Sequence, residues 1–244
     1  MPRTLRAAIG GICYHVINRG NGRAPVFHDD ADYQAFRDLF APACERLSMR
    51  VLGYCVMPNH FHLVLWPRHD GDLSRWMQWL LTSHVRRHFR RHRGSGHIWQ
   101  GRFRAFPIQQ DSHLLMVLRY VERNPLRARL VRRAENWQWS SLHDIATRRR
   151  PEWLIDGPVD RPRGWTERVH RAETAEELTA TRANIRRGTP FGRDGWVHRI
   201  AGRLGLESSL NARGRPRKEP DRMTAFFTNN KNLGESRTER LAWK

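Results

Sequence analysis

The sequence predicts an α+β fold for about its first 150 residues. Segments that alternate apolar and polar side chains, typical of strands, are interspersed with segments whose apolar residues follow the 3.6-residue spacing of amphipathic helices. Their order along the chain is strand, helix, strand, strand, helix, strand. Because this is the order of a split β-α-β sandwich, we expect a ferredoxin-like or RRM-like antiparallel sheet with its helices on one face.

The first half of this pattern has clear local signals. Residues 12–17 predict a strand, which a loop rich in Asn and Gly follows. Residues 29–47 carry the apolar stripe of a helix, and Pro42 predicts a kink or a boundary within it. Residues 51–57 and 60–66 then predict two strands joined by a tight turn.

The second half repeats the alternation. A long amphipathic helix begins near Asp72 and ends before the glycines at 94–96, and residues 101–108 predict a strand. A third helix begins near Ser112. It meets Asn124, which the following proline is expected to push out of helical geometry.

Beyond about residue 150 the composition changes. Residues 151–165 are rich in Pro, Gly and charge and predict a linker. Thr174 and Glu177 form a capping-box pattern that opens a helix, and residues 194–204 predict a second short one. These two helices are compatible with a helix-turn-helix-like DNA module or with packing elements that cover the sheet.

We therefore divide the chain into three parts. Residues 1–150 form the predicted α+β domain, and residues 151–210 form a linker with a small helical extension. Residues 211–244 carry nine Lys and Arg against four acids and few apolar residues, which predicts a basic tail that is disordered when free.

The net charge points to a polyanionic partner. The chain has 44 Lys and Arg against 24 Asp and Glu, a net charge of +20. That excess lies far beyond the roughly 2–8 charges that suit a small soluble domain. Nearly all the positive charge is arginine, which suits bidentate phosphate contacts, so nucleic acid is favoured over an anionic membrane.

Composition also excludes several classes of protein. No stretch approaches the ~18 consecutive apolar residues of a membrane span, and the first ten residues lack a secretory signal. The chain has three cysteines, Cys13, Cys44 and Cys55, which is an odd number, and none of them forms a CxxC motif. We therefore expect buried thiols in a reduced compartment and not a set of disulfides or a zinc site. The expected location is the cytoplasm, in association with the nucleoid.

Two histidines form the sharpest local motif. Because strand side chains alternate, His60 and His62 emerge on one face and Phe61 on the other. Two imidazoles one pleat apart can share a divalent cation. The spacing alone equally suits a pair of surface histidines in a nucleic-acid-binding strand.

A tyrosine and an asparagine form the second motif. Tyr120 and Asn124 are four residues apart and share a helix face if the helix continues. A tyrosine flanked by leucines is usually a core residue. Here, however, the neighbouring side chains are strongly polar, so a phenol that acts as a nucleophile on a phosphate is the competing interpretation.

Together these motifs resemble those of a known family. Residues 56–64 (VMPNHFHLV) and 119–125 (RYVERNP) are similar to the Y1 transposases of the IS200 type. Residues 14–20 (YHVINRG), 101–103 (GRF) and 137–141 (WQWSS) are similar to the subgroup of REP-associated tyrosine transposases. The resemblance covers about residues 10–143.

The resemblance implies the site of an HUH nuclease. In it, His60 and His62 bind Mg²⁺ or Mn²⁺, Asn124 matches the third ligand, and Tyr120 is the nucleophile that forms a 5′-phosphotyrosine and frees a 3′-OH. The implied substrate is single-stranded DNA folded into palindromic hairpins, as in repeated extragenic palindromes. The extension after residue 150 makes us expect a monomer rather than a homodimer.

A basic run adjoins this site. Residues 84–104 contain seven arginines, four histidines and no acid, which favours contact with DNA over a merely solvated face. Trp99, Phe103 and Phe106 are expected to stack on unpaired bases, and the histidine ladder within the run is a weaker candidate for metal binding. The arginines expected to contact DNA are Arg86, Arg87, Arg90, Arg91, Arg102, Arg104, Arg119 and Arg123.

Two interpretations of the whole chain remain. The leading one is a metal-dependent endonuclease and strand transferase for single-stranded DNA, and the alternative is a non-catalytic regulatory protein that binds structured nucleic acid. The segment at 214–218 (GRPRK) resembles an AT-hook core, and a single copy also suits a basic tail with generic phosphate affinity, which is the interpretation we favour.

Overall fold

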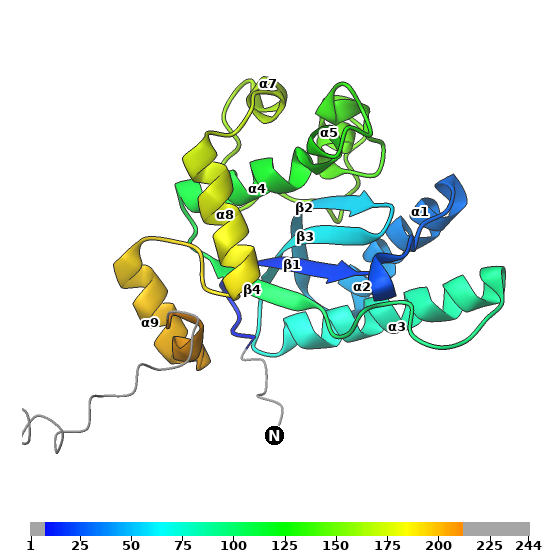
Figure 1. The fold of residues 1–244 in the computed structure, drawn as a ribbon, viewed down its shortest axis with the longest axis horizontal. Helices are drawn as coiled ribbons and strands as arrows, with labels where there is room; N and C mark the ends of the chain where they lie inside the picture. The colour runs from blue at the N-terminus through cyan, green and yellow to red at the C-terminus, as the bar shows by residue number, and fades with distance from the viewer. Residues whose placement is uncertain (1–7, 212–244) are drawn as a thin grey trace, which may run out of the picture. The chain divides into compact units, whose positions relative to one another are not determined.

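The fold is built on one four-stranded antiparallel sheet. A computed structural model describes residues 8–211. Its strands are β1 (Cys13–Arg19), β2 (Met49–Met57), β3 (His60–Pro67) and β4 (Arg104–Ile108). They lie in the order β2-β3-β1-β4, and every neighbouring pair is antiparallel (Figure 1). The predicted ferredoxin-like arrangement is confirmed.

Three helices cover one face of the sheet. They are α1 (Asp30–Arg37), α2 (Phe40–Arg46) and α3 (Asp72–His92). The break between α1 and α2 confirms the boundary that Pro42 predicted, and the proline lies in the first turn of α2, where its missing N–H costs no hydrogen bond. Apolar side chains of alternate strand residues, such as Phe61 and Leu63, pack beneath these helices.

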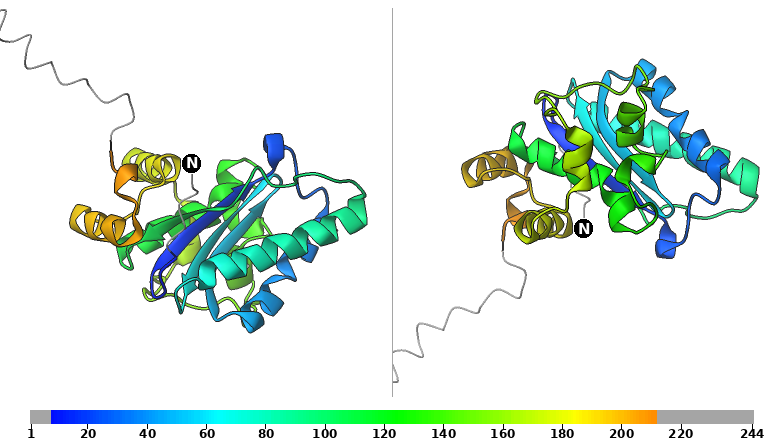
Figure 2. Two further views of the ribbon diagram at one scale, coloured as in Figure 1. Left: turned by 90° about the horizontal axis from the view of Figure 1, so that it is seen from below. Right: turned by 90° about the horizontal axis from the view of Figure 1, so that it is seen from above.

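Further helices cover the opposite face, so the prediction that the helices lie on one face is wrong. α4 (Ser112–Glu122) packs on β2 and β3, as the views in Figure 2 show. The physical reason is that β2 and β3 are apolar in both phases of their alternation. Leu52, Cys55 and Val64 face α4 in a second buried core, together with Leu118.

The C-terminal part contains several short helices. They are α5 (Asn124–Arg127), α6 (Ser141–Ala146), α7 (Trp165–His170), α8 (Ala175–Arg187) and α9 (Asp194–Leu204). The 3₁₀ turns are η1 (Asn21–Arg23), η2 (Ala134–Asn136) and η3 (Glu207–Ser209). Neither α6 nor α7 was predicted from the sequence. The capping box of Thr174 and Glu177 at the start of α8 is confirmed.

The elements after residue 150 pack on the sheet and its helices. Leu154 forms a bridge with Val51 of β2, α7 and α8 contact α4, and Ile200 of α9 is buried in the first core. Both α8 and α9 therefore act as packing elements. The boundary predicted at residue 150 stays a prediction, and the basic tail and the segment at 214–218 lie outside the described residues.

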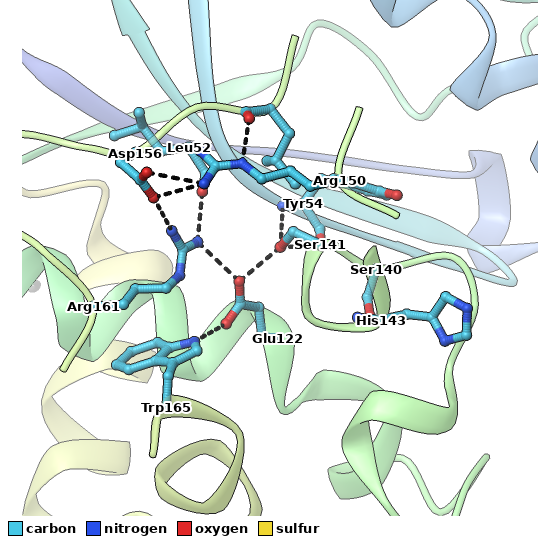
Figure 3. Close-up of polar contacts among 11 residues, drawn as sticks. Leu52, Tyr54, Glu122, Ser140, Ser141, His143, Arg150, Asp156, Arg161 and Trp165 are labelled. Atoms are coloured by element: carbon cyan, nitrogen blue, oxygen red, sulfur yellow. Dashed lines mark hydrogen bonds and ion pairs between the residues drawn. The ribbon is translucent and has the colours of Figure 1, made fainter. Parts of the chain in front are cut away.

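A buried carboxylate ties this region to α4. Glu122 is fully buried, and it accepts hydrogen bonds from Ser141 Oγ at 2.7 Å, Arg161 Nη2 at 3.1 Å and Trp165 Nε1 at 2.6 Å (Figure 3). Arg161 also donates to the carbonyl of Leu52 in β2. Because Glu122 is two residues from Tyr120, this network fixes the end of α4 that carries the tyrosine.

Cys13, Cys44 and Cys55 are free thiols, and all except the half-buried Cys44 are buried. Among residues 8–211, no helix is long and apolar enough to cross a membrane.

Candidate active site

The strand alternation places three histidines on the α4 face of the sheet. His60 and His62 project from β3, and His15 projects from the neighbouring β1. The intervening residues, such as Phe61, enter the other core. The rings of His60 and His62 are 5.0 Å apart between centroids and nearly perpendicular.

His62 is held by His15. Nε2 of His15 lies 2.9 Å from Nδ1 of His62, and both side chains are buried. Burial lowers the pKa of His15 to about 3 and the pKa of His62 well below its ordinary value. Both imidazoles are therefore neutral near pH 7, which is the form that binds metal ions.

His60 is oriented in the same way by a different partner. Its Nδ1 lies 2.7 Å from Oδ1 of Asn59. Burial, followed by the charge of Arg19, lowers the pKa of His60 to about 4. In both β3 histidines Nδ1 is engaged by a second residue, so Nε2 is the nitrogen left for a ligand.

Tyr120 and Asn124 lie opposite these histidines. The ring centroid of Tyr120 is 5.9 Å from that of His62 and 6.2 Å from that of His15. The expected break in the helix occurs one residue early, at Arg123, and Asn124 is the first residue of α5. Asn124 therefore keeps helical geometry and stays on the same side as Tyr120.

Arg127 connects the tyrosine and the asparagine. Its guanidinium carbon lies 4.2 Å from the ring centroid of Tyr120, and its Nη1 donates to Oδ1 of Asn124 at 3.3 Å. Its Nη2 pairs with Glu173 at 2.5 Å. Asn124 Nδ2 is buried without a hydrogen-bond partner within the described part of the chain.

All four predicted catalytic residues line one pocket of about 520 Å³. Five arginines share its lining, and none of the lining side chains is a carboxylate. These arginines are Arg19, Arg102, Arg104, Arg127 and Arg182. Such a pocket attracts an anion, because fixed positive charges in a concave site reinforce one another.

The donor set fits a divalent cation. It consists of two neutral imidazoles, each with Nε2 left over, and the amide oxygen of Asn124, whose carbonyl has a second lone pair beside the hydrogen bond from Arg127. Within residues 8–211 there is no group of three His, Cys, Asp or Glu residues placed to hold a metal ion. The side-chain amides of Asn18, Gln100 and Asn124 also line the pocket, and an amide oxygen is a suitable further donor for a hard cation.

The predicted DNA-contacting arginines fall into different settings. Arg102 and Arg104 line the pocket. Arg86 and Arg90 are exposed on α3. Arg87 donates to the carbonyl of Ala35, and Arg91 pairs with Asp29 and Asp32. The basic run is therefore partly neutralised by acids from the start of α1.

Arg119 and Arg123 bind the C-terminal extension. Arg119 pairs with Glu177 at 3.1 Å and donates to two carbonyls just before α8. Arg123 pairs with Glu173 at 3.2 Å and donates to the carbonyls of Val169 and His170. Their contact with DNA stays a prediction, whereas their contact with the extension is a structural fact.

The expected stacking residues are core residues. Trp99 and Phe103 are each 7% exposed and Phe106 is 1% exposed, so none presents a free ring face. The expectation that they stack openly on bases is wrong, because the loop before β4 folds onto α3 and β1. In the histidine ladder, His92 bonds to Asp32, and no metal-holding group forms there within residues 8–211.

Three residues that contact or line the site were not predicted as site residues: His15, which bonds to His62, and Arg127 and Arg182, which line the pocket. His15 was detectable in principle, because it has the alternation phase that places a side chain on the α4 face. Arg127 lies two helical turns after Tyr120, but the break between α4 and α5 concealed that relationship. Arg182 comes from α8, and no local pattern indicates that α8 reaches the pocket.

Known proteins are similar to this chain in sequence and in fold. A family model described as "Transposase IS200 like" matches residues 8–124. A protein of Haemophilus influenzae named as a REP-associated tyrosine transposase is 30% identical over 129 residues, which cover 48% of this chain and 73% of that protein. The REP-associated tyrosine transposase of Escherichia coli is 25% identical over 152 residues, or 60% of this chain and 87% of that protein.

A solved structure agrees with the fold. It is that of a REP-associated tyrosine transposase bound to a REP hairpin, with a TM-score of 0.50 and 22% identity over 66% of this chain and 94% of that chain. The chain belongs to the IS200-like transposases and, within them, to the REP-associated tyrosine transposases.

Proposed function

We propose that this protein is a metal-dependent endonuclease and strand transferase that acts on single-stranded DNA folded into hairpins. The observation that carries the proposal is the convergence of His60, His62, Tyr120 and Asn124 on one arginine-lined pocket. The hairpin substrate is supported by the solved relative, which binds a REP hairpin. A non-catalytic binder would not need a phenol and neutral imidazoles to share that pocket.

Tyr120 is the proposed nucleophile. Its Oη attacks the phosphorus of the scissile phosphodiester, the bond from phosphorus to the 3′ oxygen breaks, and a 5′-phosphotyrosine forms. The phenol loses its proton and the departing 3′ oxygen gains one. Because one phosphodiester replaces another, attack by a 3′-OH on the phosphotyrosine rejoins strands without a further energy source.

His60, His62 and Asn124 are the proposed metal ligands. Mg²⁺ or Mn²⁺, when bound, supplies Lewis-acid polarisation of the scissile phosphate. His15 and Asn59 orient the two imidazoles through Nδ1. Arg127 holds both the Tyr120 ring and the Asn124 amide, which keeps the nucleophile close to the proposed ligands.

Covalent capture tests this proposal. Wild-type protein with Mn²⁺ and a hairpin oligonucleotide labelled on the 5′-phosphate side of the cut should form an adduct that survives denaturation. Tyr120→Phe should abolish the adduct and leave hairpin affinity nearly unchanged. The double substitution of His60 and His62 by Ala should also abolish it. A wild-type protein that binds hairpins but never forms an adduct would favour the non-catalytic binder.

A further inference from the structure

The chain from the end of α7 to the start of α8 lies across the junction of α4 and α5. Arg123 forms this junction, which separates the helix of Tyr120 from the helix of Asn124. Arg119, Arg123 and Arg127, spaced four residues apart, all reach that stretch of chain. One part of the C-terminal extension therefore holds both sides of the junction, and α8, which follows it, contacts α4 (Figure 1).

Glu173 is the acidic side chain of this stretch. Its Oε2 lies 3.2 Å from Nε of Arg123, and its Oε1 lies 2.5 Å from Nη2 of Arg127. The Glu173 side chain is 8% exposed, so water and salt screen these ion pairs only weakly. Glu173 thus joins the junction residue to the last residue of α5.

The Arg127 guanidinium carries this link to the tyrosine. Its carbon Cζ lies 4.2 Å from the ring centroid of Tyr120, within the range of a cation–π contact. Nη2 donates to the backbone carbonyl of Tyr120 at 3.3 Å, and Nη1 donates to Oδ1 of Asn124 at 3.3 Å. One side chain therefore contacts the proposed nucleophile and a proposed metal ligand, and Glu173 sets its direction.

The charge of the catalytic pocket makes the pair with Glu173 necessary. Four other arginines line the pocket with Arg127, and their positive charges repel its guanidinium. They are Arg19, Arg102, Arg104 and Arg182. Within residues 8–211, Glu173 is the carboxylate that forms an ion pair with Arg127. If that charge is removed, repulsion favours a turn of the Arg127 side chain off the Tyr120 ring.

We propose that Glu173 is a positioning residue for Tyr120. It holds the Arg127 guanidinium against the phenol ring, and the ring held in this way directs Oη at the scissile phosphate. Glu173 itself does not line the catalytic pocket, so it acts through Arg127 and not on the DNA. Both residues lie beyond residues 8–124, the part of the chain that matches the family model. The proposal rests on the proposed function, because it concerns the rate at which Tyr120 attacks.

The rate of adduct formation is the first test. In a single turnover with Mn²⁺ and a labelled hairpin, Glu173→Gln should form the Tyr120 adduct about 10–100-fold more slowly than the wild type, because a small displacement of a reacting group costs this much. Hairpin affinity should change little, since the Glu173 side chain lies outside the pocket.

Glu177→Gln is the matched control. It removes the same charge close by in the sequence and breaks an ion pair with Arg119, but it does not touch Arg127. The amide oxygen of the new side chain can still accept the capping hydrogen bond from the backbone N–H of Thr174. Adduct formation in Glu177→Gln should therefore stay close to the wild-type rate.

A double-mutant cycle shows which arginine carries the effect. Arg127→Met removes the contact with the Tyr120 ring, so Glu173→Gln should slow adduct formation in the wild type and have little further effect in Arg127→Met. A structural role of Glu173 through Arg123 would persist in that background. Equal losses in the two backgrounds, or a wild-type rate in Glu173→Gln, would overturn the proposal.

Fluorine NMR follows the tyrosine ring without DNA or turnover. In protein labelled with 3-fluorotyrosine, the signal of Tyr120 is the one missing from Tyr120→Phe. We expect this signal to shift in Glu173→Gln toward its position in Arg127→Met and to stay in place in Glu177→Gln. An unshifted signal in Glu173→Gln would also overturn the proposal.

The two measurements separate this inference from the proposed function. If the wild type forms the adduct and Glu173→Gln forms it equally fast, only the Glu173 proposal fails. If the wild type forms no adduct but the Tyr120 signal shifts in Glu173→Gln, the nuclease proposal fails and the link from Glu173 through Arg127 to Tyr120 stands.

Discussion

His15 and His62 share a buried hydrogen bond between neighbouring strands, with 2.9 Å between Nε2 of His15 and Nδ1 of His62. If Nε2 of His62 is to bind a cation, its proton must lie on Nδ1 and be donated to His15. The proton of His15 then lies on its own Nδ1, which is buried without a partner in the described residues. The opposite tautomer of the pair places a proton on Nε2 of His62 and blocks it.

This relationship predicts that His15 controls metal affinity. His15→Phe removes the acceptor for the Nδ1 proton of His62, and we expect Mn²⁺ to bind about 10–100-fold more weakly. Electron paramagnetic resonance of free Mn²⁺ during titration measures the affinity without any DNA or turnover.

The matched control is His15→Gln. Its side-chain oxygen can accept the same hydrogen bond, so it should recover part of the affinity that His15→Phe loses. Equal affinities for Mn²⁺ in the wild type and in His15→Phe would show that His15 does not position His62.

The Glu122 network predicts a large effect on stability. Glu122→Ala leaves the half-buried Arg161 without its nearer carboxylate, with Asp156 remaining at 3.9 Å, and removes the acceptor of Trp165 Nε1. We expect the free energy of unfolding to fall by about 3–5 kcal/mol, as measured by urea denaturation. Arg161→Met should lower the free energy of unfolding by less in the Glu122→Ala background than in the wild type. A loss below about 1 kcal/mol in Glu122→Ala would contradict the assigned network.

Two arginines predicted to bind DNA should behave differently. Arg119→Ala removes contacts with Glu177 and with the segment before α8, so amide hydrogen exchange in α8 should become faster while hairpin affinity changes little. Arg102→Ala should weaken hairpin binding and reduce the dependence of log affinity on log salt by about one, with thermal stability unchanged.

Fluorescence anisotropy at several salt concentrations, with hydrogen exchange in parallel, checks this difference. The same loss of hairpin affinity in Arg119→Ala and Arg102→Ala, with no change of exchange in α8, would contradict the structural role of Arg119.

The burial of His84 predicts that the folded protein becomes less stable as the pH falls. Phe27, Phe36 and Trp99 surround its ring, and burial lowers its pKa from 6.5 to about 3. Between these two values the unfolded chain binds a proton that the folded chain does not. The contribution of His84 therefore opposes folding increasingly as pH falls below 6.5, by about 1.4 kcal/mol per pH unit.

Urea denaturation from about pH 7 to about pH 5 in the wild type and in His84→Phe measures this contribution. The other buried histidines are present in both proteins, so the difference in pH dependence belongs to His84. Identical slopes would show that His84 is not a neutral core residue.

Local patterns in the sequence were sufficient for the strand order and for much of the site. The pleat places His60 and His62 on one face, so that pair follows from strand geometry. Tyr120 and Asn124 share a side because Asn124 begins α5 in helical geometry, which the expected effect of Pro125 did not predict. The family resemblance indicated that the two pairs meet, and the pocket brings them together.

Contacts between distant segments were beyond local patterns. His15 is 47 residues from His62, and Arg91 is 62 residues from the Asp29 that pairs with it, so neither partner could be assigned from spacing.

By contrast, the helices on the second face of the sheet could have been predicted from the sequence. Residues 51–57 are almost continuously apolar, and a strand of this kind is buried on both faces.

The central claim is that Tyr120 becomes covalently attached to the 5′ end of cleaved DNA. Mass spectrometry of nuclease- and protease-digested adduct tests it most directly. We predict a peptide from α4 that carries a residual nucleotide through a 5′-phosphate on Tyr120, absent from Tyr120→Phe. Cleaved hairpin with no modified peptide, or modification of another residue, would contradict the account.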